Sequence, residues 1–299
     1  MSHAEIKGAM SQNSGSDPSL DPKPKASIIM GAYNASRTIE SALNSLFAQD
    51  EQNFEIVITD DGSNDDTLKI LEKYAALNPN LILARHTKNL GLATALNTSI
   101  GLAKSDYLIR QDSDDISSSN RVGTLIREFE KDHTVDVLGT YFNVMDTHMR
   151  IWGVAKYPEA PELRQWMRGT QVAHATVIMK KSSVLAVGGY DTAAIRVEDY
   201  DLWLRMIKKE MIIRTLPTAL YTVRWDIDDY KRRNAKAKWR EFRFRFNRFR
   251  DLGFGLMGVL FSFKPLLLLL IPSSLQFLKH KRSFKAASAS ATELRSYVK

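Results

Sequence analysis

Apolar runs alternate with amphipathic segments along the first two thirds of the chain. Short apolar runs bounded by turn-forming residues predict four strands, at 27–33, 54–59, 81–85 and 106–111. Apolar residues at helical spacing predict three helices between them, at 38–49, 67–77 and 92–103. Because such alternation is typical of parallel strands joined by helical crossovers, we expect an α/β fold.

Beyond residue 115 the pattern becomes mixed. It predicts strands at 135–145 and 175–179, and helices at 162–168 and 199–209. We expect one catalytic domain over residues 26–224. Residues 1–25, rich in Ser, Gly, Asp, Pro and Lys, are expected to form a disordered leader, and residues 225–299 a helical tail.

Acidic residues follow two of the predicted strands. Asp60 and Asp61 end the second strand, and Asp112 and Asp114 follow the fourth. Ligands of open α/β sheets bind beyond the carboxyl ends of the strands. Residues two apart on an extended chain point the same way, so the carboxylates of Asp112 and Asp114 can face one ligand. Carboxylate oxygens are suited to Mg²⁺ or Mn²⁺. The alternative is a solvated acidic loop.

A second acidic pair, Glu198 and Asp199, opens a predicted helix. The pair either caps the helix or supplies a general base beside an acceptor hydroxyl group. The chain has neither a P-loop nor a Gly-x-Gly-x-x-Gly fingerprint, so a bound nucleotide must be held in another way.

Six ordered motifs resemble family 2 glycosyltransferases with the GT-A fold, a Rossmann-like mixed sheet flanked by helices. They are the run 27–34, the Asp-Asp-Gly-Ser segment 58–67, Asn89 to Asn97, the Asp-Ser-Asp segment 110–116, Gly188 to Asp191, and 198–205. Together they lie within residues 26–224, about two thirds of the chain.

The resemblance implies a role for each matching residue. Asp61 would bind the nucleotide base, Asp112 would face the ribose and sugar, Asp114 would ligate the metal, and Asp199 would be the catalytic base with Glu198 in support. The rest of the nucleotide-sugar site would comprise Ala32, Tyr33, Asn34, Asn89 and Ser113. His174 and Arg205 are candidates for the acceptor or diphosphate side, although a structural role is the alternative for both.

The charge of the chain is divided unevenly. The 42 Lys and Arg residues against 34 Asp and Glu give a net charge of +8. Residues 231–299 hold 17 basic and 3 acidic side chains, a net charge of +14, which leaves −6 for residues 1–230. The chain has no cysteine, which excludes disulfides, thiolate metal sites and cysteine nucleophiles.

The tail combines this charge with apolar segments. Residues 230–250 predict a basic amphipathic helix, and residues 252–278 contain one charged residue, Lys264. Pro265 and Pro272 interrupt that segment, so two half-inserted helices are favoured over a membrane span. The alternatives are a helix that packs on the catalytic domain and a nucleic-acid-binding arm, which has no need of the apolar segment.

The resemblance implies a metal-dependent, inverting glycosyltransferase, and the tail predicts a peripheral or monotopic protein on the cytoplasmic face of the cell membrane. The resemblance implies a nucleotide-diphosphate sugar as donor, with UDP favoured, and a glycan or lipid-linked acceptor in exopolysaccharide, capsule or O-antigen synthesis. The alternative functions are an inactive nucleotide-sugar-binding scaffold and a nucleic-acid-binding protein, and the acidic balance of residues 1–230 argues against the latter.

Overall fold

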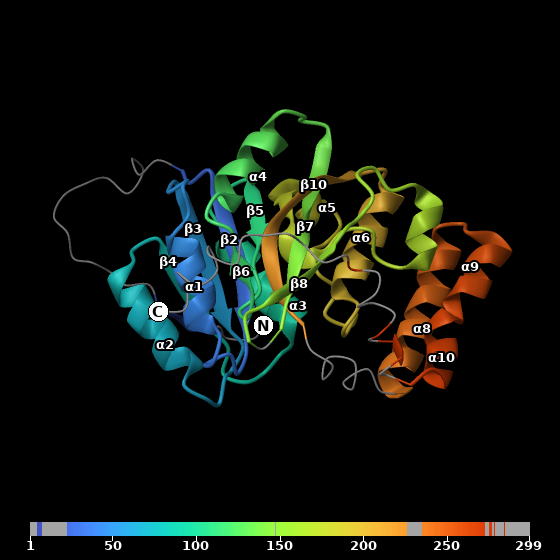
Figure 1. The fold of residues 1–299 in the computed structure, drawn as a ribbon, viewed down its shortest axis with the longest axis horizontal. Coiled ribbons are helices and arrows are strands. Elements are labelled where there is room, and N and C mark those ends of the chain that lie inside the picture. The colour runs from blue at the N-terminus through green and yellow to red at the C-terminus, as the bar shows by residue number, and fades with distance from the viewer. Residues whose placement is uncertain are drawn as a thin grey trace.

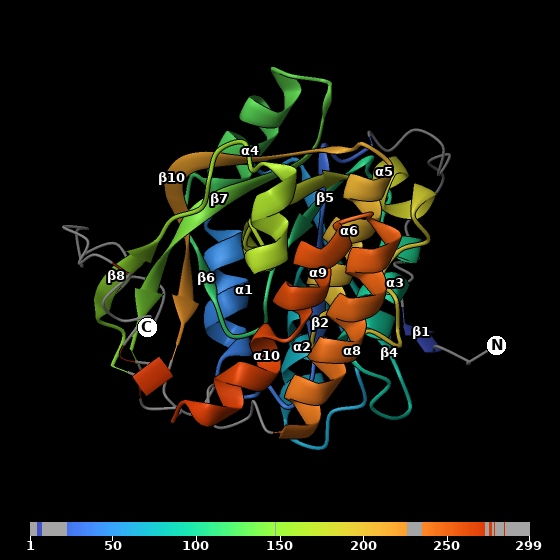
Figure 2. The same cartoon turned by 90° about the vertical axis from the view of Figure 1, so that its right-hand side faces the viewer.

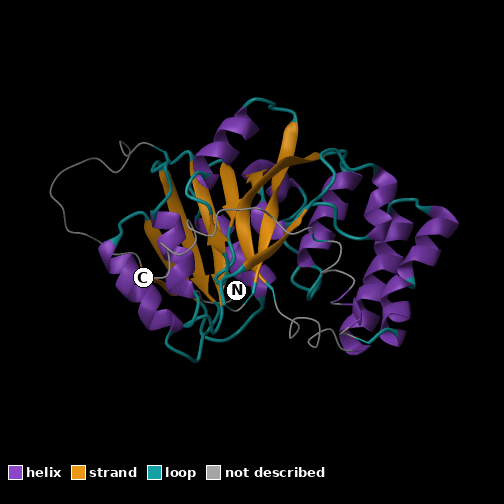
Figure 3. Cartoon of the chain, in the orientation of Figure 1, coloured by secondary structure: helices purple, strands orange, loops and turns teal. Residues whose placement is uncertain are grey.

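The computed structural model describes residues 5–7, 23–146, 148–225, 235–272, 275, 276, 278 and 284. Within them the chain forms a ten-stranded mixed sheet with helices on both faces (Figures 1 and 3). The predicted α/β class, with a Rossmann-like mixed sheet, is confirmed.

The sheet has a parallel part and a mixed part. The strands are β1 (Glu5–Lys7), β2 (Ala26–Ala32), β3 (Phe54–Asp60), β4 (Leu81–Arg85), β5 (Tyr107–Arg110), β6 (Ile116–Ser117), β7 (Val135–Met145), β8 (Ile151–Ala155), β9 (Ile178–Lys180) and β10 (Ile212–Arg224). Their order is β1-β4-β3-β2-β5-β9-β7-β10-β6, with β8 paired to β7. Because β4, β3, β2 and β5 are parallel, their carboxyl ends meet at one edge.

Helices cover both faces of this sheet. The α-helices are α1 (Ile39–Phe47), α2 (Thr67–Leu77), α3 (Leu92–Leu102), α4 (Arg121–Glu130), α5 (Lys181–Ala186), α6 (Glu198–Lys208), α8 (Ala235–Asp251), α9 (Gly255–Ser262) and α10 (Lys264–Leu267). Three 3₁₀ helices add η1 (Leu163–Arg168), η2 (His174–Thr176) and η3 (Leu268–Leu270).

Two apolar cores result from the alternation of side chains along each strand. Ile28 and Met30 of β2 point to one face and pack in the core that contains apolar residues of α1, α2 and α4. Ile29, between them, points to the other face, where α3 and α6 supply apolar residues. Trp203 and Leu204 of α6 are buried in this second core, as expected.

The structure differs from the prediction in several places. The strand expected at 175–179 begins only at Ile178, because residues 174–176 form η2, in which the backbone N–H of Thr176 donates to Ala173 O at 3.1 Å. The sequence analysis missed β6, α4, β8, α5 and β10, and β10 has register shifts around Pro217 that disturb its alternation. The strand β1 pairs with β4, so the expected disordered leader is wrong for residues 5–7.

The helices α8, α9 and α10 lie together at one end of the molecule, at the right in Figure 1 and nearest the viewer in Figure 2. Phe249 of α8 is only 1% exposed and belongs to the same core as α6. The first helix of the tail therefore packs on the catalytic domain. In the part of the chain that the structure describes, no helix combines the length and hydropathy needed to cross a membrane.

Candidate active site

The loops after β2 and β3 are joined by hydrogen bonds. The backbone N–H of Asn34 donates to Ser63 Oγ at 3.0 Å, and that of Ser36 donates to Asp65 Oδ2 at 3.1 Å. Asp65 also accepts from the Thr67 backbone and hydroxyl, and these bonds lower its pKa to about 2 even though burial acts in the opposite direction. Ala32, Tyr33 and Asn34 thus lie on a preformed edge beside Asp61.

Asp61 anchors the loop that follows β4. Its Oδ1 contacts His86 Nδ1 at 2.7 Å and accepts the N–H of Leu90 at 2.9 Å, while Oδ2 accepts the N–H of Gly91 at 2.8 Å. The neighbouring Gly62 has φ +71, and a Cβ there would lie 2.5 Å from the Lys88 backbone. These contacts fix the carboxylate that the resemblance assigns to the nucleotide base.

The Asp-Ser-Asp segment continues directly from β5. Arg110, which is fully buried, ion-pairs with Asp112, and the backbone N–H of Asp112 donates to the Tyr221 hydroxyl at 2.9 Å. Asp114 opens to solvent, but the surrounding protein and the charge of Asp112 raise its pKa to about 6. Asp115 points inward and accepts the Arg224 N–H at 3.0 Å. Its burial and the charges of Asp114 and Asp112 raise its pKa well above the usual range.

A second buried arginine supports this segment from behind. Arg121 Nη1 donates to Gln111 Oε1 at 3.0 Å, and its Nη2 donates to the carbonyl oxygens of Arg110 and Ala175 at 2.7 and 2.9 Å. Its guanidinium also lies 4.5 Å from the ring centre of Tyr221. Burial lowers its pKa to about 10, so it stays charged at neutral pH. The framework fixes where the acidic segment leaves the sheet.

The donor set of this segment fits a divalent cation of the Mg²⁺ or Mn²⁺ type. Asp114 presents hard oxygen ligands beside Asp112, and the repulsion between the two carboxylates would be relieved by a cation. Within the described ranges, no group of three or more His, Asp or Glu side chains forms a complete metal site. A cation held by Asp112 and Asp114 would take its other ligands from substrate phosphates and water.

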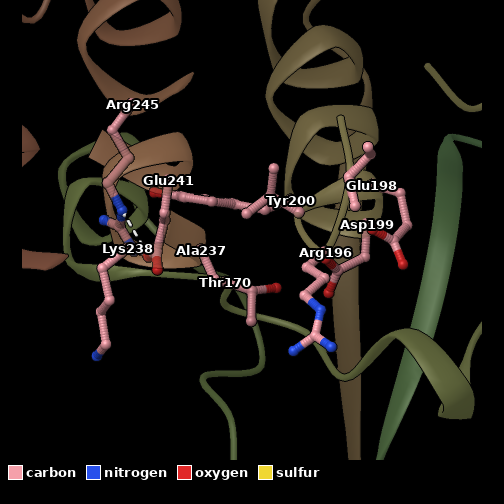
Figure 4. Close-up of a pocket in the computed structure, with 11 residues that line it drawn as sticks. Thr170, Arg196, Glu198, Asp199, Tyr200, Ala237, Lys238, Glu241 and Arg245 are labelled. Carbon is pink, nitrogen blue, oxygen red and sulfur yellow. Dashed lines mark hydrogen bonds and ion pairs between the residues drawn. The ribbon is translucent and has the colours of Figure 1, made fainter. Parts of the chain in front are cut away.

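Glu198 and Asp199 form the first turn of α6. They line a cavity of about 490 Å³ that also contacts Thr170, residues 195–197 and α8 (Figure 4). Burial and then the charge of Glu198 raise the pKa of Asp199 to about 6, and burial raises the pKa of Glu198. A carboxylate poised near neutral pH is suited to accept a proton from a hydroxyl group.

His174 begins η2 and lies beside Tyr190 and Trp203. Its Nε2 lies 2.7 Å from the Tyr190 hydroxyl oxygen, and the centre of its ring lies 6.0 Å from the centre of the Trp203 ring. Burial and then the charge of Arg110 hold its pKa well below the usual value, so the ring is neutral. The charge of Asp112 contributes to the raised pKa values of Glu198 and Asp199, so the two acidic groups are electrostatically coupled.

Arg205 stands apart from this group. Its Nε donates to Asp201 Oδ2 at 2.6 Å, and its Nη1 donates to Val187 O at 2.5 Å. It lies seven residues along α6 from Glu198, about 10 Å by the rise of a helix. These contacts give Arg205 a packing role, the alternative to its predicted place on the acceptor or diphosphate side.

The sequence analysis missed Arg121 and three other residues that organise the site. His86, Arg110 and Tyr221 hold Asp61 and Asp112 in place. Arg110 is the last residue of β5, just before the acidic segment 112–114, so its position in the sequence could have identified it. Neither His86 nor Tyr221 lies near its partner in the sequence. Asn89 is exposed on the loop that binds Asp61, and Ser113 is half-buried between the two aspartates.

The family follows from comparison with known proteins. The sequence model described as Glycosyl transferase family 2 matches residues 27–187, which contain the loops after β2, β3 and β5. The chain belongs to this family. The match covers more than half of the chain and includes the acidic segment 112–114.

Relatives of this family 2 glycosyltransferase extend the similarity over most of the chain. EpsE of Bacillus subtilis, whose name describes a glycosyltransferase, is 33% identical over 266 residues, 88% of this chain and 95% of its own. The amylovoran biosynthesis glycosyltransferase AmsE of Erwinia amylovora is 29% identical over 70% of this chain and 79% of its own. WfaP of Escherichia coli, named a UDP-Glc:alpha-D-GlcNAc-diphosphoundecaprenol beta-1,3-glucosyltransferase, is 30% identical over 61% and 70%.

Solved structures support the GT-A fold. A crystal structure of S. aureus TarS residues 1–349 with UDP has a TM-score of 0.55 and 25% identity, covering 70% of this chain and 63% of that one. The mannosyltransferase PcManGT of Pyrobaculum calidifontis, in complex with GDP-Man and Mn²⁺, has a TM-score of 0.59 at 15% identity. It covers 92% of this chain and 86% of its own, and at this identity the likeness concerns the fold alone.

Proposed function

We propose that this family 2 glycosyltransferase moves a sugar from a nucleotide-diphosphate sugar to a hydroxyl group of a glycan or lipid-linked acceptor, with inversion. The observation that carries the proposal is the presence of two acidic groups, one at 112–114 directly after β5 and held by Arg110 and Tyr221, the other at 198–199 at the start of α6 on the wall of a cavity. One group suits a donor diphosphate and the other an acceptor. A protein that only binds nucleotide sugars has no need of a carboxylate on the acceptor side.

The donor would lie along the strand ends. Asp61 accepts a hydrogen bond from the base beside Ala32, Tyr33 and Asn34, and Asp112 faces the ribose and sugar. UDP is the favoured nucleotide, and the UDP complex of the related TarS supports this choice. Asn89 and Ser113 border the same space.

Asp114, with Asp112 beside it, would hold Mn²⁺ or Mg²⁺. When bound, such a cation neutralises the negative charge that develops on the departing diphosphate. Arg110 keeps Asp112 in position for this site. The Mn²⁺ named in the PcManGT complex is a parallel in a protein of the same fold.

Asp199 would accept the proton of the acceptor hydroxyl, and Glu198 would support it. The deprotonated oxygen then forms a bond to the anomeric carbon as the bond to the diphosphate breaks on the opposite face. One displacement of this kind inverts the anomeric configuration. The neutral imidazole of His174 would lie beside the diphosphate or the acceptor as a hydrogen-bonding group.

The relatives favour a role in surface polysaccharide synthesis. The name of AmsE describes amylovoran biosynthesis, and that of WfaP describes transfer to a lipid diphosphate. An acceptor of one of these kinds is made at a membrane, which suits the tail of this chain. We therefore place the protein at the cytoplasmic face of the cell membrane as a peripheral or monotopic protein.

The exposed side of the C-terminal helices supports membrane docking. Apolar side chains of α9, α10 and η3 are exposed, among them Leu256 at 75% and Leu270 at 82%. Exposed basic residues of α8, including Arg240 and Arg243, lie on the neighbouring helix. An apolar surface flanked by positive charge suits an anionic bilayer. Residues 279–285, which include Lys279, Lys281, Arg282 and Lys285, lie largely outside the described residues.

A screen of UDP- and GDP-sugars tests the function. We expect one donor to raise the melting temperature in the presence of Mn²⁺ and to release its nucleotide when acceptor is present. Donor binding without nucleotide release under any acceptor condition would favour the inactive scaffold. Absence of metal-dependent binding of every nucleotide sugar would refute the proposal.

A further inference from the structure

A second cavity lies between α8 and the loop 191–197, which precedes α6. Its volume is about 550 Å³, enough for a small ligand, and Arg240 and Arg243 of α8 line one side of it. We infer that this cavity binds the phosphate of an anionic phospholipid, and that Arg240 and Arg243 hold it. The assignment rests on the membrane docking proposed above.

The charges of these two arginines are not neutralised within the protein. In the part of the chain that the structure describes, neither guanidinium group has an ion pair or a hydrogen bond. Arg248, on the same side of the cavity, is already paired: its Nη2 lies 2.7 Å from Asp201 Oδ1 and 3.5 Å from Asp191 Oδ2. The carboxylate of Asp191, which also lines the cavity, is therefore offset by Arg248, and the two other arginines remain to attract an anion.

The geometry of α8 brings these side chains to one ligand. Residues three or four apart on a helix are neighbours, with about 5–6 Å between their Cβ atoms, and this spacing joins Arg240 to Arg243 and Arg243 to Asn247. All three side chains line the same cavity. Each guanidinium group can donate two hydrogen bonds to a phosphate, and the Asn247 amide can donate another.

Aromatic side chains connect the arginines with the apolar surface of the tail. Trp239 and Phe246, which are 53% and 37% exposed, lie within one helical turn of Arg243. The ring centre of Phe242 lies 6.1 Å from that of Phe246 and 4.9 Å from that of Phe263, between α9 and α10. Because tryptophan favours the boundary between lipid and water, this strip suits the edge of a bilayer.

A phospholipid matches this surface better than a soluble anion does. Its phosphate would enter the cavity, while the surrounding bilayer covers exposed apolar side chains such as Leu260, at 57%. Ile195, which is 55% exposed, adds an apolar side chain on the loop side of the cavity. A free phosphate or a nucleic acid would leave this apolar surface in water.

The loop 191–197 separates this cavity from the acidic pair of α6. Ile195 and Val197 line both this cavity and the one beside Glu198 and Asp199. A headgroup bound here would therefore hold the start of α6 close to the membrane surface. This orientation suits an enzyme whose acceptor is made at a membrane.

Calorimetry on the full chain tests the site. The probes are dihexanoylphosphatidylglycerol and dihexanoylphosphatidylcholine, both below their micelle concentrations, and inorganic phosphate. Because a lipid monomer has no surface potential, general attraction to a charged bilayer does not contribute. We expect the phosphatidylglycerol to bind at least about tenfold more tightly than the other two probes. Arg240→Gln and Arg243→Gln should each weaken its binding by about tenfold or more, the effect of losing a charged hydrogen bond.

Arg250→Gln and Lys236→Gln are the matched controls, because each removes one exposed positive charge from α8 outside the cavity. Each should change binding of the lipid monomer by less than about twofold. Equal losses in the controls, equal binding of the two lipids, or no binding of the phosphatidylglycerol would overturn the assignment. Tighter binding of inorganic phosphate or of a single-stranded oligothymidylate would also overturn it.

The two proposals fail in different ways. If the wild-type chain does not sediment with phosphatidylglycerol vesicles, the proposed membrane docking itself fails. If it sediments with them and the monomer does not depend on the two arginines, only the headgroup site fails. An unchanged midpoint of urea unfolding shows that each glutamine variant is folded.

Discussion

The pH dependence of transfer tests the assignment of Asp199 as the base. Burial and the neighbouring Glu198 raise its pKa from 3.8 to about 6. The base must be ionised to accept a proton, so activity should fall as the pH drops through this value. Ionisation would be about 91% at pH 7 and about 9% at pH 5, so kcat/KM for the acceptor should fall roughly tenfold between them.

An ordinary aspartate gives a different profile. With a pKa of 3.8, it would stay more than about 90% ionised at pH 5, and activity would hardly change. Initial rates of UDP release should therefore be measured from pH 5 to pH 8 at constant ionic strength. Donor and metal must be saturating, because the pKa of Asp114 is also raised to about 6. Its protonation would otherwise weaken metal binding in the same pH range and imitate the loss of the base.

Two variants separate the base from general effects of pH. Asp199→Asn should bind donor normally and lose transfer by at least about a hundredfold, the usual scale of acid–base catalysis. Glu198→Gln removes a negative charge that raises the pKa of Asp199, so it should move the acidic limb to lower pH. A flat wild-type profile, an unmoved limb in Glu198→Gln, or full activity of Asp199→Asn would refute the assignment.

Three further outcomes are expected. Asp114→Ala should weaken Mn²⁺-dependent UDP binding at least tenfold by calorimetry, and unchanged affinity would remove it from the metal site. Asp201→Ala should lower the free energy of unfolding in urea by about 3 kcal/mol because the half-buried Arg205 and Arg248 lose the buried carboxylate that they share, whereas the exposed Asp251→Asn should change it by less than about 0.5 kcal/mol. Equal losses in those two variants would contradict this reasoning. Leu260→Asp should reduce sedimentation with anionic vesicles, and an equal effect of Leu77→Asp, on the distant α2, would argue against the docking surface.

The donor half of the molecule was predictable from the sequence. The helix over 67–77 and the strands over 81–85 and 135–145 have the predicted bounds, because apolar periodicity and turn residues coincide there. The acidic positions 61 and 112–114 follow from the same argument, since parallel strands bring their carboxyl ends to one edge. Their chemical roles came from the family resemblance and stay predictions.

The parts that the sequence left open depend on distant contacts. Arg121 reaches the carbonyl oxygen of Ala175, and His86 reaches Asp61 and Thr98, so no local pattern identifies them. The short strand β9 could not be separated from the turn before it by periodicity. The bounds of the cavity beside Glu198 and Asp199 depend on the position of α8, where Arg248 pairs with Asp201 of α6.

The net charge of the tail overstates its attraction to a membrane. Arg245 and Arg248 lie against the catalytic domain and pair with Glu241 and Asp201, so their charges are used within the protein. The exposed cations on α8 are Lys236, Arg240, Arg243 and Arg250. At about 1 kcal/mol for each basic residue near an anionic surface, these four contribute about 4 kcal/mol at moderate salt. Salt screens this electrostatic contribution, with a Debye length of about 8 Å at physiological ionic strength. Binding that persists in high salt must therefore come from the exposed apolar side chains of α9 and α10.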